Sequence, residues 1–310
     1  MRRRDFVRAA GAALPLAGCA PALAASPDAA APDAASPDAL ADAVPGGVPA
    51  RSASGRQSFR HSVCRWPFGD WSLDELCGVA ADLGVASVEL VQPSDAPTLA
   101  AHGLTCAMTA HPEAAPDALR QGWNTAAHHD WLVPAYRDAL AATADAGWDR
   151  LICFSGNRNG RDDADGLETM ARGLERILPD AERLGVTVCL ELFNSKVDHP
   201  GYQADSTAWG VALVERLASP QFRLLYDVYH MQIMEGDVIR TLTDHLDAVA
   251  HVHVAGVPGR HEPDETQELF YPAIVRALDA AGYAGFVAQE FLPTGDPRAA
   301  LADAVARCSV

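Results

Sequence analysis

The chain has 310 residues, and 49% of them are hydrophobic, which is enough for the core of one large domain or of two small ones and excludes a disordered protein. Acidic residues outnumber basic ones 41 to 24. Because a surface of this charge repels phosphate backbones and no basic run interrupts it, the composition argues against nucleic acid as a partner.

The seven cysteines show no C-x-x-C spacing. Three of them, Cys106, Cys153 and Cys189, lie within apolar runs that are typical of strands. This placement favours free, buried thiols over disulfides.

Residues 1–25 have the pattern of an export signal: a basic start, a short apolar segment of small residues, and small residues suited to cleavage. An arginine pair before Asp5 and Phe6 resembles a twin-arginine signal, which sends folded proteins across the membrane. We therefore expect an exported, periplasmic protein. Two processing routes stay open: lipidation at Cys19, within a lipobox-like Leu-Ala-Gly-Cys, would anchor the chain to the membrane, and cleavage near Ala25 would release it.

Residues 26–58 are rich in Ala, Pro, Asp, Ser and Gly and contain few bulky apolar side chains. Such a segment cannot build a core, so we expect a disordered linker between the signal and the folded body, residues 59–310. Residues 1–25 hold four arginines and one aspartate, so the rest of the chain has 20 basic and 40 acidic residues and a net charge of −20.

From residue 59 onward, short β-rich apolar runs alternate with longer segments of helical period, as in parallel β/α units. The predicted strands are residues 59–64, 85–91, 104–109, 150–155, 186–193, 222–228, 249–254 and 285–291. The predicted helices are residues 72–83, 95–102, 131–146, 165–184, 206–218, 236–247, 271–281 and 297–307. Eight strands and eight helices predict a closed (β/α)8 TIM barrel of the α/β class. An open sheet is less favoured, because it would more often carry a glycine-rich phosphate loop after its first strand, and this chain has none.

Four polar side chains close consecutive predicted strands. Glu191 ends the fifth strand, Asp227 the sixth, His253 the seventh and Glu290 the eighth. Barrel enzymes place their chemistry at the C-terminal ends of the strands, so these side chains should meet. Three carboxylates and one imidazole suit a single divalent metal ion such as Mg²⁺, Mn²⁺, Co²⁺ or Zn²⁺.

Such a site suits proton transfer next to a carbonyl group. A divalent ion held there can chelate two neighbouring oxygens of an α-hydroxy carbonyl compound and stabilise an enediolate. Glu191 and Glu290 flank the set in sequence and are the natural pair to remove and return the carbon-bound proton. The residues therefore predict a metal-dependent isomerase or epimerase.

Six segments resemble the hydroxypyruvate isomerase family of xylose-isomerase-like barrels: SVCRW, CFSGNR, LELFNSKVDHPGY, LLYDVYHMQIMEGD, HVHVAGVPGRHEPDETQELFYPAI and GYAGFVAQEF. The resemblance covers residues 59–309 and implies conversion of hydroxypyruvate to tartronate semialdehyde, with Glu191 and Glu290 as catalytic residues that also bind the metal. It further implies that His230 and Arg260 hold substrate oxygens, the arginine being suited to a carboxylate.

Further candidates follow the earlier strands. Glu89 ends the second predicted strand, His111 follows the third and Asn157 follows the fourth. We expect them to contact the substrate or to orient a ligand, with a purely structural role as the alternative. Trp66 and Trp123 are candidate walls of the pocket.

Other functions stay open on the residues alone. The same site suits a sugar, in a ketose 3-epimerase or an aldose-ketose isomerase. An endonuclease for apurinic sites, which the superfamily also includes, is opposed by the net charge of −20. A tethered sugar-binding lipoprotein without catalysis is a further alternative, and a homo-oligomer is compatible with each of these functions.

Overall fold

The computed structural model describes residues 57–310. The predicted export signal with Cys19, and the predicted linker as far as residue 56, lie outside the described residues. No helix within the described range is both long and apolar enough to cross a bilayer.

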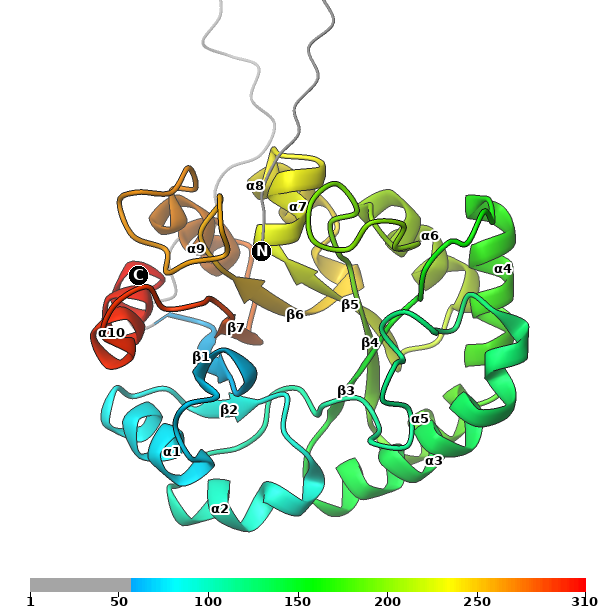
Figure 1. The fold of residues 1–310 in the computed structure, drawn as a ribbon, viewed down its shortest axis with the longest axis horizontal. Coiled ribbons are helices and arrows are strands. Elements are labelled where there is room, and N and C mark those ends of the chain that lie inside the picture. The colour runs from blue at the N-terminus through cyan, green and yellow to red at the C-terminus, as the bar shows by residue number, and fades with distance from the viewer. Residues whose placement is uncertain (1–56) are drawn as a thin grey trace, which may run out of the picture. The chain divides into compact units, whose positions relative to one another are not determined.

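Seven parallel strands form one curved sheet. They are β1 (Arg60–Cys64), β2 (Ser87–Glu89), β3 (Arg150–Cys153), β4 (Thr187–Glu191), β5 (Phe222–Asp227), β6 (Val249–Val254) and β7 (Phe286–Gln289). Their order in the sheet is β2-β1-β7-β6-β5-β4-β3, so the first and the last strand of the domain pair with each other. Figure 1 shows the strands around a central axis with the helices outside them.

The third predicted strand, residues 104–109, connects the two edges of the sheet without forming a regular ladder. Thr105 bridges to Ser87 in β2, and Thr109 bridges to β3. Between them the amide of Ala107 donates to the hydroxyl of Ser87 (2.8 Å), which interrupts the backbone ladder. The prediction of eight regular strands is therefore wrong at this segment, whereas the predicted α/β barrel class is confirmed.

The helices lie outside the strands. Within residues 57–310 they are α1 (Leu73–Asp82), α2 (Ala96–Ala101), α3 (His129–Asp145), α4 (Asp163–Leu174), α5 (Leu178–Leu184), α6 (Thr207–Leu217), α7 (Val228–Met234), α8 (Val238–Asp244), α9 (Tyr271–Ala280) and α10 (Pro297–Arg307). Ser72 and Glu75 form a capping box at the start of α1, and Ser206 caps α6, because these side chains satisfy amides that have no partner inside the helix.

Two helices differ from the prediction. The single helix predicted over residues 165–184 is divided into α4 and α5, because Pro179 has no amide hydrogen to donate to Glu175 and its ring clashes with that turn. Helix α7 has no counterpart in the prediction. It begins directly after β5, where the side chain of Asp227 accepts hydrogen bonds from the amides of Tyr229 (2.8 Å) and His230 (3.4 Å).

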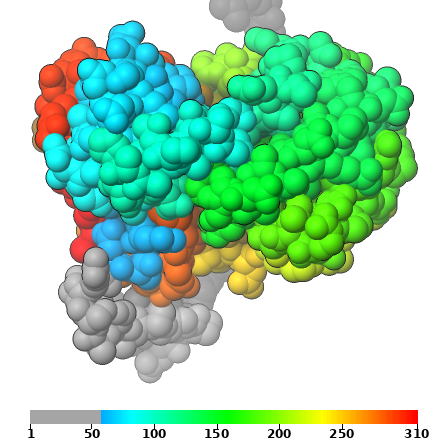
Figure 2. Space-filling view, turned by 90° about the horizontal axis from the view of Figure 1, so that it is seen from below, coloured from blue at the N-terminus to red at the C-terminus, as the bar shows by residue number. Residues whose placement is uncertain are grey.

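The two ends of the domain also meet at the surface. In the side view of Figure 2 the cyan and green segments, from α1 to α4, form one face, with the red C-terminal residues beside the cyan ones. Arg298 of α10 pairs with Asp82 of α1 at 3.1 Å. Inside, the expectation of free, buried thiols is confirmed for Cys106, Cys153 and Cys189.

Candidate active site

The four predicted metal ligands meet at the C-terminal end of the barrel. Glu191 and Asp227 are the last residues of β4 and β5, His253 lies one residue before the end of β6, and Glu290 directly follows β7. Each offers a ligand atom, and these atoms all lie within 4.8 Å of one another. All four residues are at most 3% exposed. The parallel register accounts for this cluster, since it places Asp227 directly beside His253.

Glu290 is held by contacts on both of its oxygens. Its Oε1 accepts a hydrogen bond from the indole of Trp66 (2.7 Å). Its Oε2 lies 3.0 Å from Nδ1 of His253 and also accepts from the guanidinium of Arg260. Arg260 donates in addition to Oδ2 of Asp227 (3.3 Å). The guanidinium therefore links two of the three carboxylates.

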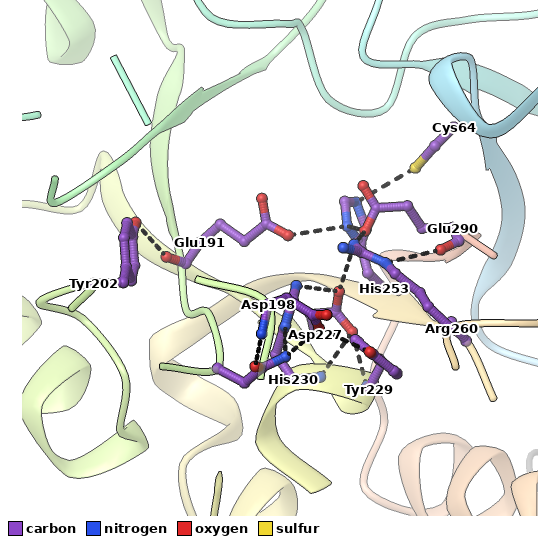
Figure 3. Close-up of polar contacts among 12 residues, drawn as sticks. Cys64, Glu191, Asp198, Tyr202, Asp227, Tyr229, His230, His253, Arg260 and Glu290 are labelled. Atoms are coloured by element: carbon purple, nitrogen blue, oxygen red, sulfur yellow. Dashed lines mark hydrogen bonds and ion pairs between the residues drawn. The ribbon is translucent and has the colours of Figure 1, made fainter. Parts of the chain in front are cut away.

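Glu191 reaches the cluster from the side opposite Arg260 (Figure 3). Its Oε1 lies 3.6 Å from Nδ1 of His253, beyond hydrogen-bond distance, and is buried without a partner. Burial and the nearby carboxylates of Glu290 and Asp227 raise the pKa of Glu191 to about 8, against the attraction of His253. Glu191 thus has an oxygen that is available to a bound molecule or ion.

The pKa values of the other two carboxylates, Glu290 and Asp227, shift in opposite directions although both contact Arg260. Burial opposes the ionisation of Glu290, yet Arg260 and then His253 hold its pKa well below the usual range. Burial raises the pKa of Asp227 to about 6, with Arg260 opposing the rise and Glu290 adding to it. The three buried carboxylates share the guanidinium of Arg260 and the ring of His253, and a divalent ion that took the place of the ring proton would balance their charge.

The donor set fits a divalent metal ion. Carboxylate oxygens and an imidazole nitrogen are the ligands that Mg²⁺, Mn²⁺ and Zn²⁺ take in proteins. The buried, unpaired Oε1 of Glu191 would gain a partner, and the excess carboxylate charge would be balanced. Arg260 would then be freed to bind other anions.

A cavity of about 390 Å³ lies beside the cluster, within the size range of small-molecule sites. Glu191, Glu290 and Arg260 form its charged side. Of the two tryptophans expected to wall the pocket, Trp66 does so, whereas Trp123 is buried in the core. The remaining lining residues are mostly apolar: Leu90, Ala110, His111, Leu119, Ile152, Phe154, Phe193 and His199.

The other predicted site residues occupy different positions. His111 lines the cavity, and burial lowers its pKa. His230 is fully buried, with Nδ1 2.7 Å from the side-chain amide of Asn194 and with Nε2 lacking a partner. Burial keeps the pKa of His230 well below its usual value, so the ring is neutral. Glu89 lies beneath the cluster, and Asn157 does not line the cavity, because its backbone bridges to the loop after β4.

Sequence reasoning missed three polar residues near the site. Cys64 and His251 are fully buried beneath the four ligands, and His199 lines the cavity. Strand alternation is a signal for His251, which precedes His253 by two residues in β6 and therefore shares its face of the strand. No periodic signal exists for His199, which comes from an irregular loop and stacks on Phe193 with 4.3 Å between ring centres.

The fold is a parallel α/β barrel with a carboxylate-rich cluster at the C-terminal ends of its strands, so the protein belongs to the class of TIM-barrel proteins with a candidate active site at that end. The chain matches the family described as "Xylose isomerase-like TIM barrel" over residues 77–308 and belongs to that family. The predicted membership of the xylose-isomerase-like barrels is thereby confirmed.

Named isomerases are among the relatives of the chain. A putative hydroxypyruvate isomerase of Homo sapiens is 28% identical over 252 residues, which cover 81% of this chain and 86% of that protein. A 2-oxo-tetronate isomerase of Cupriavidus necator is 36% identical over 142 residues, 45% of this chain and 54% of that protein. A solved structure described as AP endonuclease, family 2, from Brucella melitensis has a TM-score of 0.69 and 28% identity, covering 80% of this chain and 99% of that one.

Proposed function

We propose that the protein is a metal-dependent isomerase of small α-hydroxy carbonyl compounds, with hydroxypyruvate and tartronate semialdehyde as the first pair to test. The enzyme class rests on relatives named as isomerases of hydroxypyruvate and of 2-oxo-tetronate. The observation that carries the proposal is Glu191, whose Oε1 is buried without a partner and whose side chain both lines the cavity and belongs to the cluster of metal-ligand groups.

The proposed metal ligands are the four clustered side chains, Glu191, Asp227, His253 and Glu290. These residues would hold a divalent ion, which would supply positive charge to stabilise the negative charge that develops on substrate oxygens when the carbon-bound proton leaves. Glu191 would contact the ion through one carboxylate oxygen and, with the other, remove the proton from C3 and return it to C2, while the proton of the C3 hydroxyl passes to the oxygen of C2. Glu290 exchanges a proton only after it releases Trp66 or Arg260, which occupy its oxygens.

Arg260 is the proposed site for the substrate carboxylate. Its guanidinium lines the cavity and lies over the rings of Trp66 and Tyr229, 5.2 and 5.3 Å from their centres. These rings hold the guanidinium plane without using its N–H donors, which would become available to a substrate carboxylate when a bound ion replaces Arg260 at Glu290 and Asp227. His230 is fully buried and does not line the cavity, but its unpaired Nε2–H lies 3.5 Å from Asp227 and is the proposed second donor for a substrate oxygen that reaches the cluster.

A larger substrate is the second candidate, because the cavity exceeds the volume of a three-carbon acid. At about 30 Å³ per water at liquid density, 390 Å³ corresponds to roughly a dozen waters, whereas hydroxypyruvate has about seven non-hydrogen atoms. The extra space favours a four-carbon 2-oxo acid or a ketose. A ketose 3-epimerase or an aldose-ketose isomerase would use the same pair, Glu191 and Glu290, for proton transfer.

The test is proton exchange in deuterated water. The purified full-length chain, with Mg²⁺ or Mn²⁺, is incubated with hydroxypyruvate and in parallel with a four-carbon 2-oxo acid and a panel of free ketoses. We expect deuterium on the reacting carbons of a 2-oxo acid, seen by NMR, and none with chelated protein. Exchange confined to ketoses would favour the second candidate, and no exchange with any compound at any metal would overturn the proposal.

We also propose that the protein is exported. The support is the pair Arg3-Arg4 before Asp5 in a basic, then apolar, N-terminal segment. Cell fractionation should find the chain in the periplasm, or in the membrane fraction if Cys19 is lipidated. Replacing both arginines by lysine should retain it in the cytoplasm, and equal export of that variant would contradict a twin-arginine route.

A further inference from the structure

A second buried carboxylate lies directly beneath the proposed metal ligands. Oε1 of Glu89 is 2.8 Å from Nε2 of His251 and 2.8 Å from Nε2 of His253. The thiol of Cys64 lies 3.7 Å from the same oxygen and 3.8 Å from Nε2 of His253. All four residues are 0% exposed. Glu89 does not line the substrate cavity, so its contacts are with other side chains of the barrel interior.

The two ring nitrogens of His253 face different groups. Nδ1 faces the carboxylates of Glu290 at 3.0 Å and Glu191 at 3.6 Å, whereas Nε2 faces Glu89. Oε1 of Glu89 lies at hydrogen-bond distance from a ring nitrogen of each histidine, and a carboxylate oxygen placed between two imidazoles accepts from both, so this geometry places a proton on Nε2 of His253.

That assignment decides which nitrogen is left for an ion. Nδ1 of His253 lies 3.0 Å from Oε2 of Glu290, and an ion bound among the carboxylates would take the place of the proton between them and accept the lone pair of Nδ1. A buried carboxylate is stable only when it is paired, and His251 supplies a second hydrogen bond to Oε1 of Glu89, whereas Oε2 is buried without a partner. His251 thereby fixes Glu89, and Glu89 fixes the ring of His253.

We propose that Glu89 is a positioning residue of the metal site: it orients His253, holds the tautomer that presents Nδ1 as a ligand, and is itself held by His251. The inference rests on the proposed metal-dependent function, since it assigns the support of that same site. Carboxylates that accept from a ligating histidine orient the ring and raise its basicity, and their loss typically costs about 10- to 100-fold in metal affinity.

The first experiment measures metal affinity without substrate. Mn²⁺ is titrated calorimetrically into the metal-free, full-length wild type, into Glu89→Gln and into Thr109→Val. Thr109 is a matched control, because it is another buried polar residue of the barrel wall and its hydroxyl has no partner. We expect one Mn²⁺ per wild-type chain, a loss of about 10- to 100-fold in affinity for Glu89→Gln, and no change for Thr109→Val.

The second experiment reads the tautomer directly. Long-range ¹H–¹⁵N correlation spectra of histidine-labelled protein loaded with Zn²⁺, a diamagnetic ion, distinguish protonated from unprotonated ring nitrogens, and the signals of His253 are identified by their loss in His253→Gln. We expect Nε2 to be protonated in the wild type and in Glu89→Asp, with partial recovery of Mn²⁺ affinity in the latter. In Glu89→Gln the side-chain amide can donate as well as accept, so the preference should be lost.

Several outcomes would overturn the inference alone: unchanged Mn²⁺ affinity in Glu89→Gln, a wild-type ring of His253 protonated on Nδ1, or a second Mn²⁺ whose binding depends on Glu89 and His251. If Glu89→Gln does not fold, the Mn²⁺ affinities of Glu89→Asp and His251→Gln are compared with that of the wild type instead, and we expect smaller losses of affinity. A wild-type chain that binds no divalent ion would instead overturn the metal-dependent function on which the inference rests.

Discussion

The two sides of the cavity differ in chemistry although both are built from strand ends. The ends of β4 to β7 carry Glu191, Asp227, His253 and Glu290, and Arg260 lies against them. The ends of β2, the bridging segment 105–109 and β3 are followed by apolar lining residues, among them Leu90, Ala110 and Phe154. The barrel therefore separates a charged half from an apolar half within one small space.

The chemical difference suggests that the charged side carries out the reaction and that the apolar side selects the substrate. Charged groups on one side can hold an ion and move a proton, and an apolar wall opposite them excludes water and strengthens their interactions. The same wall offers a substrate few hydrogen bonds, with His111 and His199 as its polar contributions. It selects mainly by shape and length, an effect worth roughly 1–3 kcal/mol per methylene group. Variants on the two sides should accordingly fail in different ways.

The largest effect is expected for Glu191→Gln on the charged side. This change removes the unpaired oxygen proposed to exchange the carbon-bound proton, so deuterium incorporation should fall by about 10²- to 10⁴-fold. Glu235→Gln is the matched control, because Glu235 only accepts hydrogen bonds from Thr207 at the start of α6 and should exchange deuterium at the wild-type rate. Exchange by Glu191→Gln within tenfold of the wild type would remove Glu191 from the reaction.

A smaller effect is expected for Arg260→Met, which keeps side-chain length and removes charge. If the guanidinium binds a substrate carboxylate, kcat/KM for 2-oxo acids should fall by about 10- to 100-fold, the range of a lost charge-assisted hydrogen bond. Affinity for Mn²⁺ should rise at the same time, because Arg260 no longer competes for Glu290 and Asp227. Equal losses for 2-oxo acids and uncharged ketoses would contradict the carboxylate assignment.

The contrast between the two halves also explains which parts of the structure could be predicted from the sequence. Glu191, Asp227, His253 and Glu290 were predictable, because each closes a clear apolar run and parallel strands bring their C-terminal ends together. The alternation of apolar runs with segments of helical period likewise predicted the order of strands and helices. The break in the ladder at residues 104–109 was not predictable, because it depends on a side-chain hydroxyl, that of Ser87, replacing a backbone acceptor.

The supporting residues were harder to predict, because their contacts join segments far apart in the chain. Glu89 ends an apolar run like the four ligands, but its pairing with two histidines of β6 depends on the packing of the barrel interior. His199 lies in a loop without periodicity, and its place in the cavity depends on stacking against Phe193. The apolar side of the cavity, which we expect to select substrates, is therefore harder to predict from the sequence than the charged side.

The smallest effect is expected on the apolar side, for Leu119→Ala. Leu119 lines the cavity and touches neither the metal ligands nor Arg260 through a polar group, so Mn²⁺ affinity and exchange of hydroxypyruvate should stay near wild type. For a longer 2-oxo acid or a ketose, kcat/KM should change by about tenfold or less, because only contacts along the tail are lost. Leu217→Ala is the control, since Leu217 is also partly buried against the core but lies at the end of α6. Equal changes for short and long substrates would show that the apolar half does not select by length, and the division between the two halves would then lose its functional meaning.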